Sequence, residues 1–208
     1  DLIPLGKLIL SVAGATALFI CVVALIASLF TGINFFHVIR ALKDILFLAF
    51  STASSEAALP GAMKRLEELG VPKTIVTFVM PTGYSFNLDG STLYSSAGIL
   101  FIAQLYGIQM PIEQQLLVMV TLMLSTKGIA GVPGAGIIVV AATAAAFNLP
   151  TEGVAILLGI DRLLDMIRTI CNVCGNCMAT VVVACWEKEL NKATFNEKYR
   201  AFLGGKNR

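Results

Sequence analysis

Residues 45–63 read ILFLAFSTASSEAALPGAM, and this stretch decides the fold because its apolar ends enclose a centre of small and polar residues. Such a centre suits a chain reversal better than the middle of a lipid-facing helix. Basic residues flank both ends, with Arg40 and Lys43 before the stretch and Lys64 and Arg65 after it. Because Lys and Arg collect on the cytoplasmic side of membranes, we expect both ends on that side. The stretch is therefore predicted to form a re-entrant hairpin.

The composition of the whole chain supports a membrane protein. Of 208 residues, 57% are hydrophobic and 13% are charged, and the mean hydropathy is +0.83. Soluble domains contain about a quarter charged residues. Residues 8–30 carry no charge, and about 20 such residues suffice to cross a bilayer. The chain opens at Asp1 without a basic leader or cleavage site, so 8–30 is interpreted as a span inside a longer protein.

A second interrupted segment covers residues 116–147. The loops on either side of it contain Glu113 and Glu152 but no Lys or Arg, and its centre at 128–136 reads GIAGVPGAG. Acidic flanks and a glycine-rich centre predict a second hairpin, entering from the outer side.

The remaining segments complete an inverted repeat. Each hairpin is followed by an apolar segment, and these two segments must cross the membrane in opposite directions. The expected order is span 8–30, hairpin 45–63, broken span 74–106, hairpin 116–147, span 154–186 and cytoplasmic tail 187–208. Inverted repeats with interrupted helices are typical of secondary transporters, whose binding site lies near the midplane. We therefore predict an all-α membrane protein.

Polar residues recur along one face of the last span. Asp161, Asp165, Arg168, Asn172 and Asn176 follow one another at intervals of four, three, four and four residues, which places them on one side of a helix. A charge at the bilayer centre costs about 2.5–3.5 kcal/mol and needs a partner or a function. The favoured interpretation is a ligand-binding face. The alternative is a structural ion pair between Asp165 and Arg168.

The span 74–106 is interrupted by TGYSFNLDGS at 82–91. Two glycines around Asn87 and Asp89 can unwind a turn, so freed carbonyls and these side chains could form an oxygen cage for a hard cation such as Na⁺. The alternative is a kink whose polar groups satisfy one another. The two hairpin tips would offer helix ends and free N–H groups, which suit a carboxylate.

Other classes of function receive less support. A net charge of +2 without a basic stripe does not indicate nucleic acid. Cys171, Cys174 and Cys177 lack the fourth Cys and following Pro of an iron–sulfur motif, so no cofactor is expected. No enzyme motif is present; an aspartyl protease using Asp89 and Asp165 would lack its Gly-x-Gly-Asp context. A channel subunit is a further alternative, because polar stripes also line pores.

Four motifs occur in a fixed order along the chain. They are SSEAALP at 54–60, NLDG at 87–90, GIAGVPG at 128–134, and DMIRT at 165–169 followed by Asn172. Together they resemble the dicarboxylate/amino acid:cation symporter family, and within it the bacterial proton/sodium–glutamate symporters. The resemblance covers nearly the whole chain as the C-terminal half of the family, so the scaffold half is absent.

The resemblance implies symport of glutamate or aspartate, with C4-dicarboxylates as the alternative. Arg168 would bind the side-chain carboxylate of the substrate in bidentate fashion, and Asp165 would bind its amino group. A C4-dicarboxylate has no such amino group, so Asp165 favours an amino acid. The full substrate set implied by the family is Ser54, Ser55, Ser91, Gly131, Val132, Asp165, Arg168, Thr169 and Asn172.

The resemblance also implies Na⁺ or H⁺ as coupling ions, an outer gate in the second hairpin and elevator motion against a trimeric scaffold. Ser95 stands where animal members have a proton-coupling Glu, and Asn176 stands where archaeal and animal members have Asp. The implied cation sites comprise Gly83, Asn87, Asn172 and Asn176 in one, Asn87 and Asp89 in a second, and Ser85, Thr126, Lys127 and Gly128 in a third.

Overall fold

A computed structural model describes residues 3–127 and 134–205, and the regular elements in those ranges are all α-helices. The all-α prediction is confirmed. Gly128, Gly131 and Val132 of the predicted site lie outside the described residues. The helices are α1 (Ile3–Thr31), α2 (Phe35–Thr52), α3 (Ser55–Glu68), α4 (Lys73–Phe86), α5 (Asp89–Leu105), α6 (Ile112–Ser125), α7 (Ala135–Ala146), α8 (Glu152–Leu158), α9 (Asp161–Trp186) and α10 (Lys192–Gly205).

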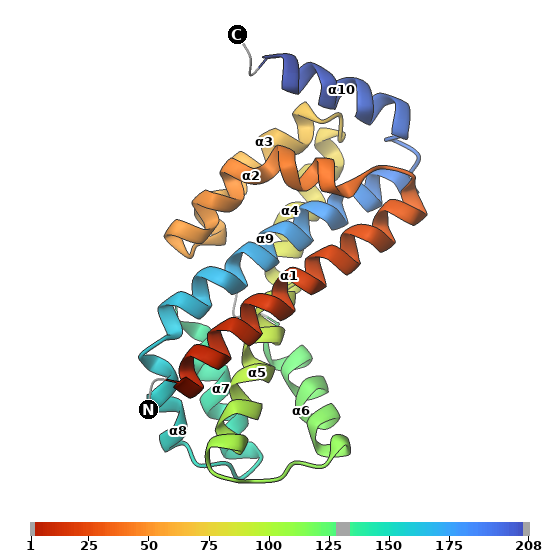
Figure 1. Ribbon diagram of the computed structural model, residues 1–208. Coiled ribbons are helices and arrows are strands. Elements are labelled where there is room, and N and C mark those ends of the chain that lie inside the picture. The colour runs from red at the N-terminus through yellow and green to blue at the C-terminus, as the bar shows by residue number, and fades with distance from the viewer. Residues whose placement is uncertain (1–2, 128–133, 206–208) are drawn as a thin grey trace.

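Helix α9 runs through the middle of the molecule and contacts both of its ends (Figure 1). Helices α2, α3 and α4 pack around its C-terminal half, whereas α5 to α8 gather at its N-terminal end. Among the described residues, the buried apolar side chains form two clusters that correspond to these two ends. The polar face of α9 lies between the clusters, where elements from both ends meet.

Helices α2 and α3 pack against each other and are joined by only two residues. Ala53 adopts the left-handed conformation with φ of 49° and ends α2. Ser54 begins α3, because its side-chain oxygen accepts a hydrogen bond from the Ala57 N–H at 3.3 Å. Such a cap satisfies one of the N–H groups left free at a helix start. The small polar centre of 45–63 is thus the turn between two helices.

The chain leaves helical geometry between α4 and α5. Asn87 has φ of −100° and ψ of 78°, and Leu88 has φ of −109° and ψ of 55°. The last carbonyls of α4 and the first N–H groups of α5 therefore meet at this break. Helix α7 begins after Gly134, whose φ of 73° is in the region that favours glycine.

Two segments differ from the simple runs expected from hydropathy. The segment 154–186 is divided into α8 and α9 by a break at Gly159 and Ile160. The segment 187–208 contains α10, which packs on the rest of the molecule through buried Phe195 and Tyr199. The Tyr199 ring stacks on the His37 ring of α2 with centroids 4.6 Å apart.

The outer surface of several helices is apolar. Within the described ranges, α1 and α9 are long and apolar enough to cross a membrane, by length and composition. Two thirds of the α9 window is buried inside the molecule, whereas most of the α1 window is not. Exposed large apolar side chains on α1 and α6 include Leu18, Phe30, Leu117 and Leu124.

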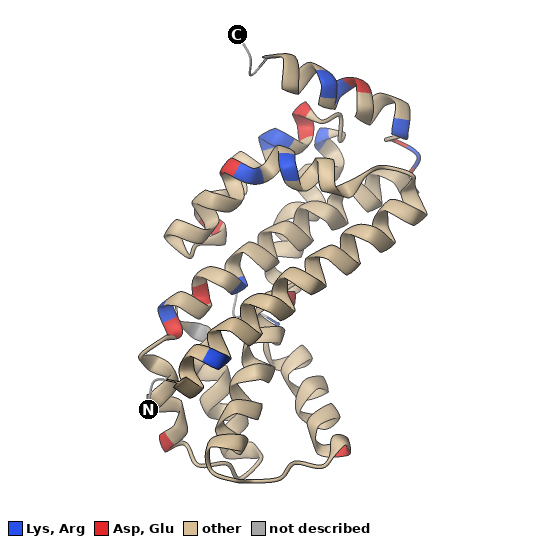
Figure 2. Ribbon diagram, viewed as in Figure 1, with Lys and Arg blue, Asp and Glu red and all other residues tan. Residues whose placement is uncertain are grey.

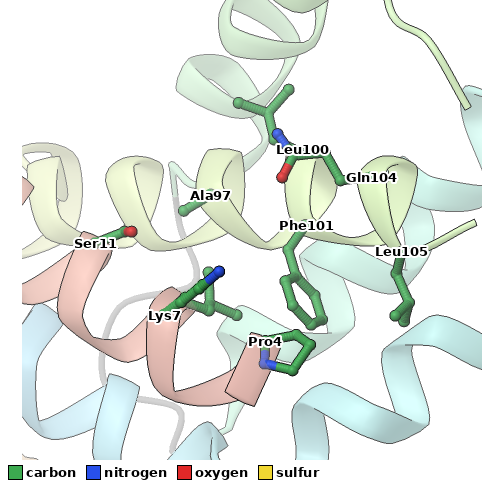
Figure 3. Close-up of a pocket in the computed structure, with 9 residues that line it drawn as sticks. Pro4, Lys7, Ser11, Ala97, Leu100, Phe101, Gln104 and Leu105 are labelled. Atoms are coloured by element: carbon green, nitrogen blue, oxygen red, sulfur yellow. The ribbon is translucent and has the colours of Figure 1, made fainter. Parts of the chain in front are cut away.

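A groove of about 490 Å³ lies between α1 and α5. Figure 3 shows Pro4 and Lys7 of α1 facing Phe101 of α5 across it. Lys7 is the one charged residue among those that line the groove, and none of the predicted site residues does so. The groove is therefore separate from the candidate site.

Candidate substrate and cation site

The polar face of α9 is buried. Asp165, Arg168, Thr169, Asn172 and Asn176 are each less than a tenth exposed. Their spacing of three or four residues brings them to one side of the helix, and that side faces the starts of α5 and α7 and the end of α4. Residues predicted to bind substrate and residues predicted to bind cations thus line one continuous strip.

The two buried charges at the centre of this strip pair with each other. Arg168 Nε donates a hydrogen bond to Asp165 Oδ1 at 2.6 Å, and both side chains are almost fully enclosed. Thr169 Oγ1 donates to the Asp165 backbone oxygen at 2.8 Å. An ion pair this short and buried offsets much of the cost of removing each charge from water. Through Nε the pair uses one of the five guanidinium donors of Arg168.

The rest of the Arg168 guanidinium lies between α5 and α7. Its central carbon is 5.8 Å from the centroid of the Tyr94 ring. A Cβ placed on Gly136 would lie 2.5 Å from Arg168 Nη1, so the absence of a side chain there leaves room for the guanidinium. Neither Tyr94 nor Gly136 was among the predicted site residues, although Gly136 belongs to the glycine-rich run that marked this region.

Asn172 connects α9 to the first turn of α5. Its Oδ1 accepts a hydrogen bond from the Gly90 N–H at 2.8 Å, and its Nδ2 donates to Ser91 Oγ at 3.2 Å. Gly90 is pressed against α9, because an added Cβ would lie 2.7 Å from the Cys171 Cβ and would collide with the Arg168 carbonyl oxygen. The predicted residues Ser91 and Asn172 are therefore neighbours in the structure.

The cation residues gather at the break between α4 and α5. With its amide nitrogen turned toward Asp89, Asn87 donates to the two carboxylate oxygens at 2.9 and 3.0 Å. A Cβ on Gly83 would lie 2.5 Å from Asn176 Oδ1, and one on Gly175 would lie 3.1 Å from Asp89 Oδ2. Gly83, Asn87, Asp89 and Asn176 thus form an oxygen-rich cluster one turn beyond Asn172.

Two further predicted residues reach the break from α6. Thr126 Oγ1 lies 3.1 Å from Thr92 Oγ1, so it contacts α5. Lys127 Nζ donates a hydrogen bond to the Phe86 carbonyl oxygen at 2.5 Å. Ser85 precedes Phe86 at the end of α4. The end of α6 therefore lies beside the same oxygen cluster, although no spacing rule links 126 or 127 to 86.

The turn between α2 and α3 reaches α9 at two places. Ser55 lines a small cavity together with Tyr84 and Asn176, while Ser54 caps α3. At the start of α9, Arg162 Nη2 donates to the Thr52 carbonyl oxygen at 3.0 Å. The structure therefore brings Ser55 to the Asn176 end of the strip.

Asp161 has a partner outside α9. Its carboxylate accepts a hydrogen bond from the Tyr94 hydroxyl at 2.6 Å. Helical spacing could place Asp161 on the polar face. The sequence could not predict its partner, because the bond joins residues 67 positions apart that only the fold brings together.

Comparison with known sequences identifies the family. A profile of the sodium:dicarboxylate symporter family matches residues 1–186. The chain belongs to the sodium:dicarboxylate symporter family. The predicted resemblance is thereby confirmed, and this transporter family supports a membrane location.

Individual relatives carry informative names. A proton/sodium-glutamate symport protein of Geobacillus stearothermophilus is 54% identical over 193 residues, which cover 92% of this chain and 46% of the relative. A proton/glutamate-aspartate symporter of Escherichia coli strain K12 is 48% identical over 201 residues, covering 97% and 46% respectively. A C4-dicarboxylate transport protein of Burkholderia pseudomallei strain 668 is 43% identical over 206 residues, covering 99% and 47%. The chain spans about half the length of these curated relatives.

Proposed function

We propose that this chain forms the transport core of a symporter that carries glutamate or aspartate together with Na⁺, H⁺ or both. The observation that supports this most directly is the buried Asp165–Arg168 pair. It presents one fixed charge of each sign at a strip that also holds an oxygen-rich cluster. An acidic amino acid has an ammonium group for the carboxylate and a side-chain carboxylate for the guanidinium.

Arg168 binds the side-chain carboxylate of the substrate through its terminal N–H groups, and Asp165 binds the ammonium group. Thr169, Asn172 and Ser91 add polar contacts along the same strip, with Ser54 and Ser55 contributed by the turn between α2 and α3. Gly131 and Val132, which lie outside the described residues, complete the pocket in this proposal. The first turn of α7 supports the choice of an anion, because Gly136 lies against Arg168 and helix starts favour negative charge.

The coupling cations bind at the break between α4 and α5. Asn87 and Asp89 supply side-chain oxygens, with Gly83, Asn172 and Asn176 beside them, while Ser85 and Thr126 to Gly128 form a neighbouring site. Oxygen ligands suit hard cations such as Na⁺. A cation here also lowers the electrostatic cost of an anionic substrate in a site of low dielectric constant, so cation and substrate binding strengthen each other.

The helix pairs α2–α3 and α6–α7 act as re-entrant hairpins that enter from the cytoplasmic and outer sides. Each is followed by a membrane-crossing element, which gives the inverted repeat of a secondary transporter. The pair α6–α7 serves as the outer gate, and the core moves as an elevator against a homotrimeric scaffold formed by the other half of such proteins. This topology receives support from the charge distribution described in the Discussion.

A C4-dicarboxylate is the second candidate substrate, because a relative with that name is 43% identical to this chain. Asp165 favours the amino acid, since a dicarboxylate would face a carboxylate without offering it a cation. A channel or a protease would need features that the strip does not provide, such as an open polar pore or two carboxylates sharing one proton.

Uptake into vesicles tests the proposal. Protein carrying this chain is reconstituted, and radiolabelled glutamate, aspartate and succinate are offered with an imposed Na⁺ gradient, an imposed proton gradient, or neither. We expect glutamate or aspartate to accumulate only when a gradient is present. Accumulation of succinate in preference to both amino acids would select the second candidate, and equal uptake without any gradient would exclude coupled symport.

A further inference from the structure

Lys127 binds a backbone carbonyl at the helix break between α4 and α5. Its Nζ donates to the Phe86 oxygen at 2.5 Å, and the two residues are 41 positions apart in the chain. Phe86 is the last residue of α4. The final carbonyls of a helix have no partner within it and carry the negative end of the helix dipole. The Lys127 ammonium group therefore lies at a position where a free cation would also be stabilised.

The carboxylate at the break reinforces this position. Asp89 begins α5 directly after the break and interacts electrostatically with Lys127. The amide of Asn87 is turned toward Asp89 as well, but it contributes no net charge. Lys127 thus brings a positive charge to the side of the break on which Asp89 lies.

We propose that Lys127 is a tethered cation that competes with a free Na⁺ ion for the Phe86 carbonyl at this break. The proposal rests on the cation coupling proposed above and adds to it a determinant of how many free ions the break binds. An ammonium group is a compact point charge on a flexible stem, so it can occupy the carbonyl or leave it. While the Lys127 ammonium group is bound to the Phe86 carbonyl, the break binds one free cation fewer.

This role differs measurably from that of a simple structural tie. If Lys127 only fastens α6 to α4, its removal lowers stability by the same amount at every Na⁺ concentration. If it takes the place of an ion, its removal opens a site for one more Na⁺. Stabilisation by a ligand that binds only the folded state grows with ligand concentration. Removal of Lys127 should therefore steepen the dependence of stability on Na⁺.

Thermal unfolding of purified protein carrying this chain provides the test. The melting temperature is measured over a series of NaCl concentrations, with choline chloride keeping the ionic strength constant. Lys127→Met removes the charge and keeps an apolar stem of similar length, and Lys127→Arg keeps the charge. Lys7→Met is the matched control, because Lys7 lies in the groove between α1 and α5 and away from the break.

We expect stability to depend more steeply on Na⁺ concentration in Lys127→Met than in the wild type, by an amount that corresponds to about one more Na⁺ bound per folded molecule. The dependence should be unchanged in Lys127→Arg and Lys7→Met. The same slopes are then read from Na⁺-dependent glutamate binding. Parallel curves for wild type and Lys127→Met, or a slope increase in Lys7→Met as well, would overturn the proposal. The gradient-driven uptake experiment judges the proposed function separately, because it uses only the wild-type protein.

Discussion

Arg168 illustrates how single residues shape the strip on α9. Its Nε is bonded to Asp165 while Nη1 faces the start of α7, so the two ends of one guanidinium have different surroundings. A planar guanidinium can satisfy a carboxylate with two parallel N–H groups, whereas a lysine offers a single point charge. Arg168 is therefore suited to hold Asp165 and a second carboxylate at the same time.

Substitutions at this pair should separate the candidate substrates. Asp165→Ser removes the partner of an ammonium group, and losing such a partner in a buried site costs about 2–5 kcal/mol. We expect glutamate and aspartate uptake to fall strongly while succinate uptake is affected much less. Arg168→Ala should depress uptake of all three, because each carries a carboxylate of the kind that Arg168 is proposed to bind.

Competition assays in vesicles measure these effects, with surface expression of each variant as the control. An unchanged ranking of the three substrates in Asp165→Ser would contradict the role assigned to Asp165. The same conclusion would follow if the wild type preferred succinate to both amino acids.

The close approach of Gly90 to α9 leads to a prediction about stability. A Cβ at this position would collide with the Arg168 carbonyl oxygen, a backbone atom that cannot move alone. Gly90→Ala should therefore push α5 away from α9 and lower the free energy of unfolding by about 1–3 kcal/mol, the usual cost of overpacking. Gly98→Ala is the control, since its Cβ would meet side chains at an ordinary 3.4 Å or more.

Thermal unfolding, followed through the fluorescence of the single tryptophan Trp186, compares the two variants. Equal melting temperatures for Gly90→Ala and Gly98→Ala would show that α5 and α9 do not depend on this close approach.

Sequence spacing predicted one part of the site and missed another for a clear reason. Residues 165, 168, 172 and 176 share one face because a helix has a fixed period, so their common burial could be expected from the sequence. Tyr94 and Gly136 meet Arg168 only because α5 and α7 pack beside α9. Local pattern carries no information on such long-range packing.

At the scale of elements, the break between α4 and α5 gathers the groups that suit a cation. Helix ends leave backbone carbonyls and N–H groups without partners. The Gly90 N–H is bonded to Asn172 and the Phe86 carbonyl to Lys127, so both sides of the break are connected to other helices. The break is therefore held open in a defined geometry by α6 and α9.

Asp89→Asn tests the electrostatic part of this element. The substitution keeps the size and a side-chain oxygen but removes the negative charge that is proposed to attract the coupling cation. We expect the Na⁺ dependence of glutamate binding to weaken severely, while the protein remains folded. Binding is measured with and without Na⁺ at several pH values. Identical affinities with and without Na⁺ in the wild type would show that the break is only a kink.

Hydropathy alone could not place the ends of two elements. The run 154–186 is continuously apolar enough to suggest one helix, yet the chain is broken at Gly159 and Ile160 before the charged start of α9. At the C-terminus, α10 has too few apolar residues to stand out in sequence, but its Phe195 and Tyr199 are buried, and the Tyr199 ring stacks on His37 of α2. Both differences arise from tertiary packing that single-segment patterns do not describe.

The whole molecule is electrically asymmetric along its length. Figure 2 shows that most Lys and Arg positions lie at the end formed by α2, α3 and α10, where acidic positions are interspersed among them. The opposite end, where α6 and α8 begin, presents Glu113 and Glu152 in their first turns. The helices between the two ends are largely uncharged apart from the polar strip. By the positive-inside rule, this distribution supports the proposed orientation, in which the α10 end faces the cytoplasm.

This orientation predicts opposite accessibility for the two ends. In a background whose native cysteines are replaced by Ser or Ala, Glu152→Cys should react with a membrane-impermeant maleimide added to intact cells, because α8 begins at the outer end. Lys192→Cys, at the start of α10, should react only after the cells are made permeable. Gel-shift labelling of each variant before and after permeabilisation measures this, and normal glutamate uptake by both variants shows that the fold is retained.

Reversed labelling would place the basic end outside and exclude the topology proposed for α2–α3 and α6–α7. Labelling of both residues in intact cells would instead show that the two ends share one side, so that the pairs could not enter the membrane from opposite faces.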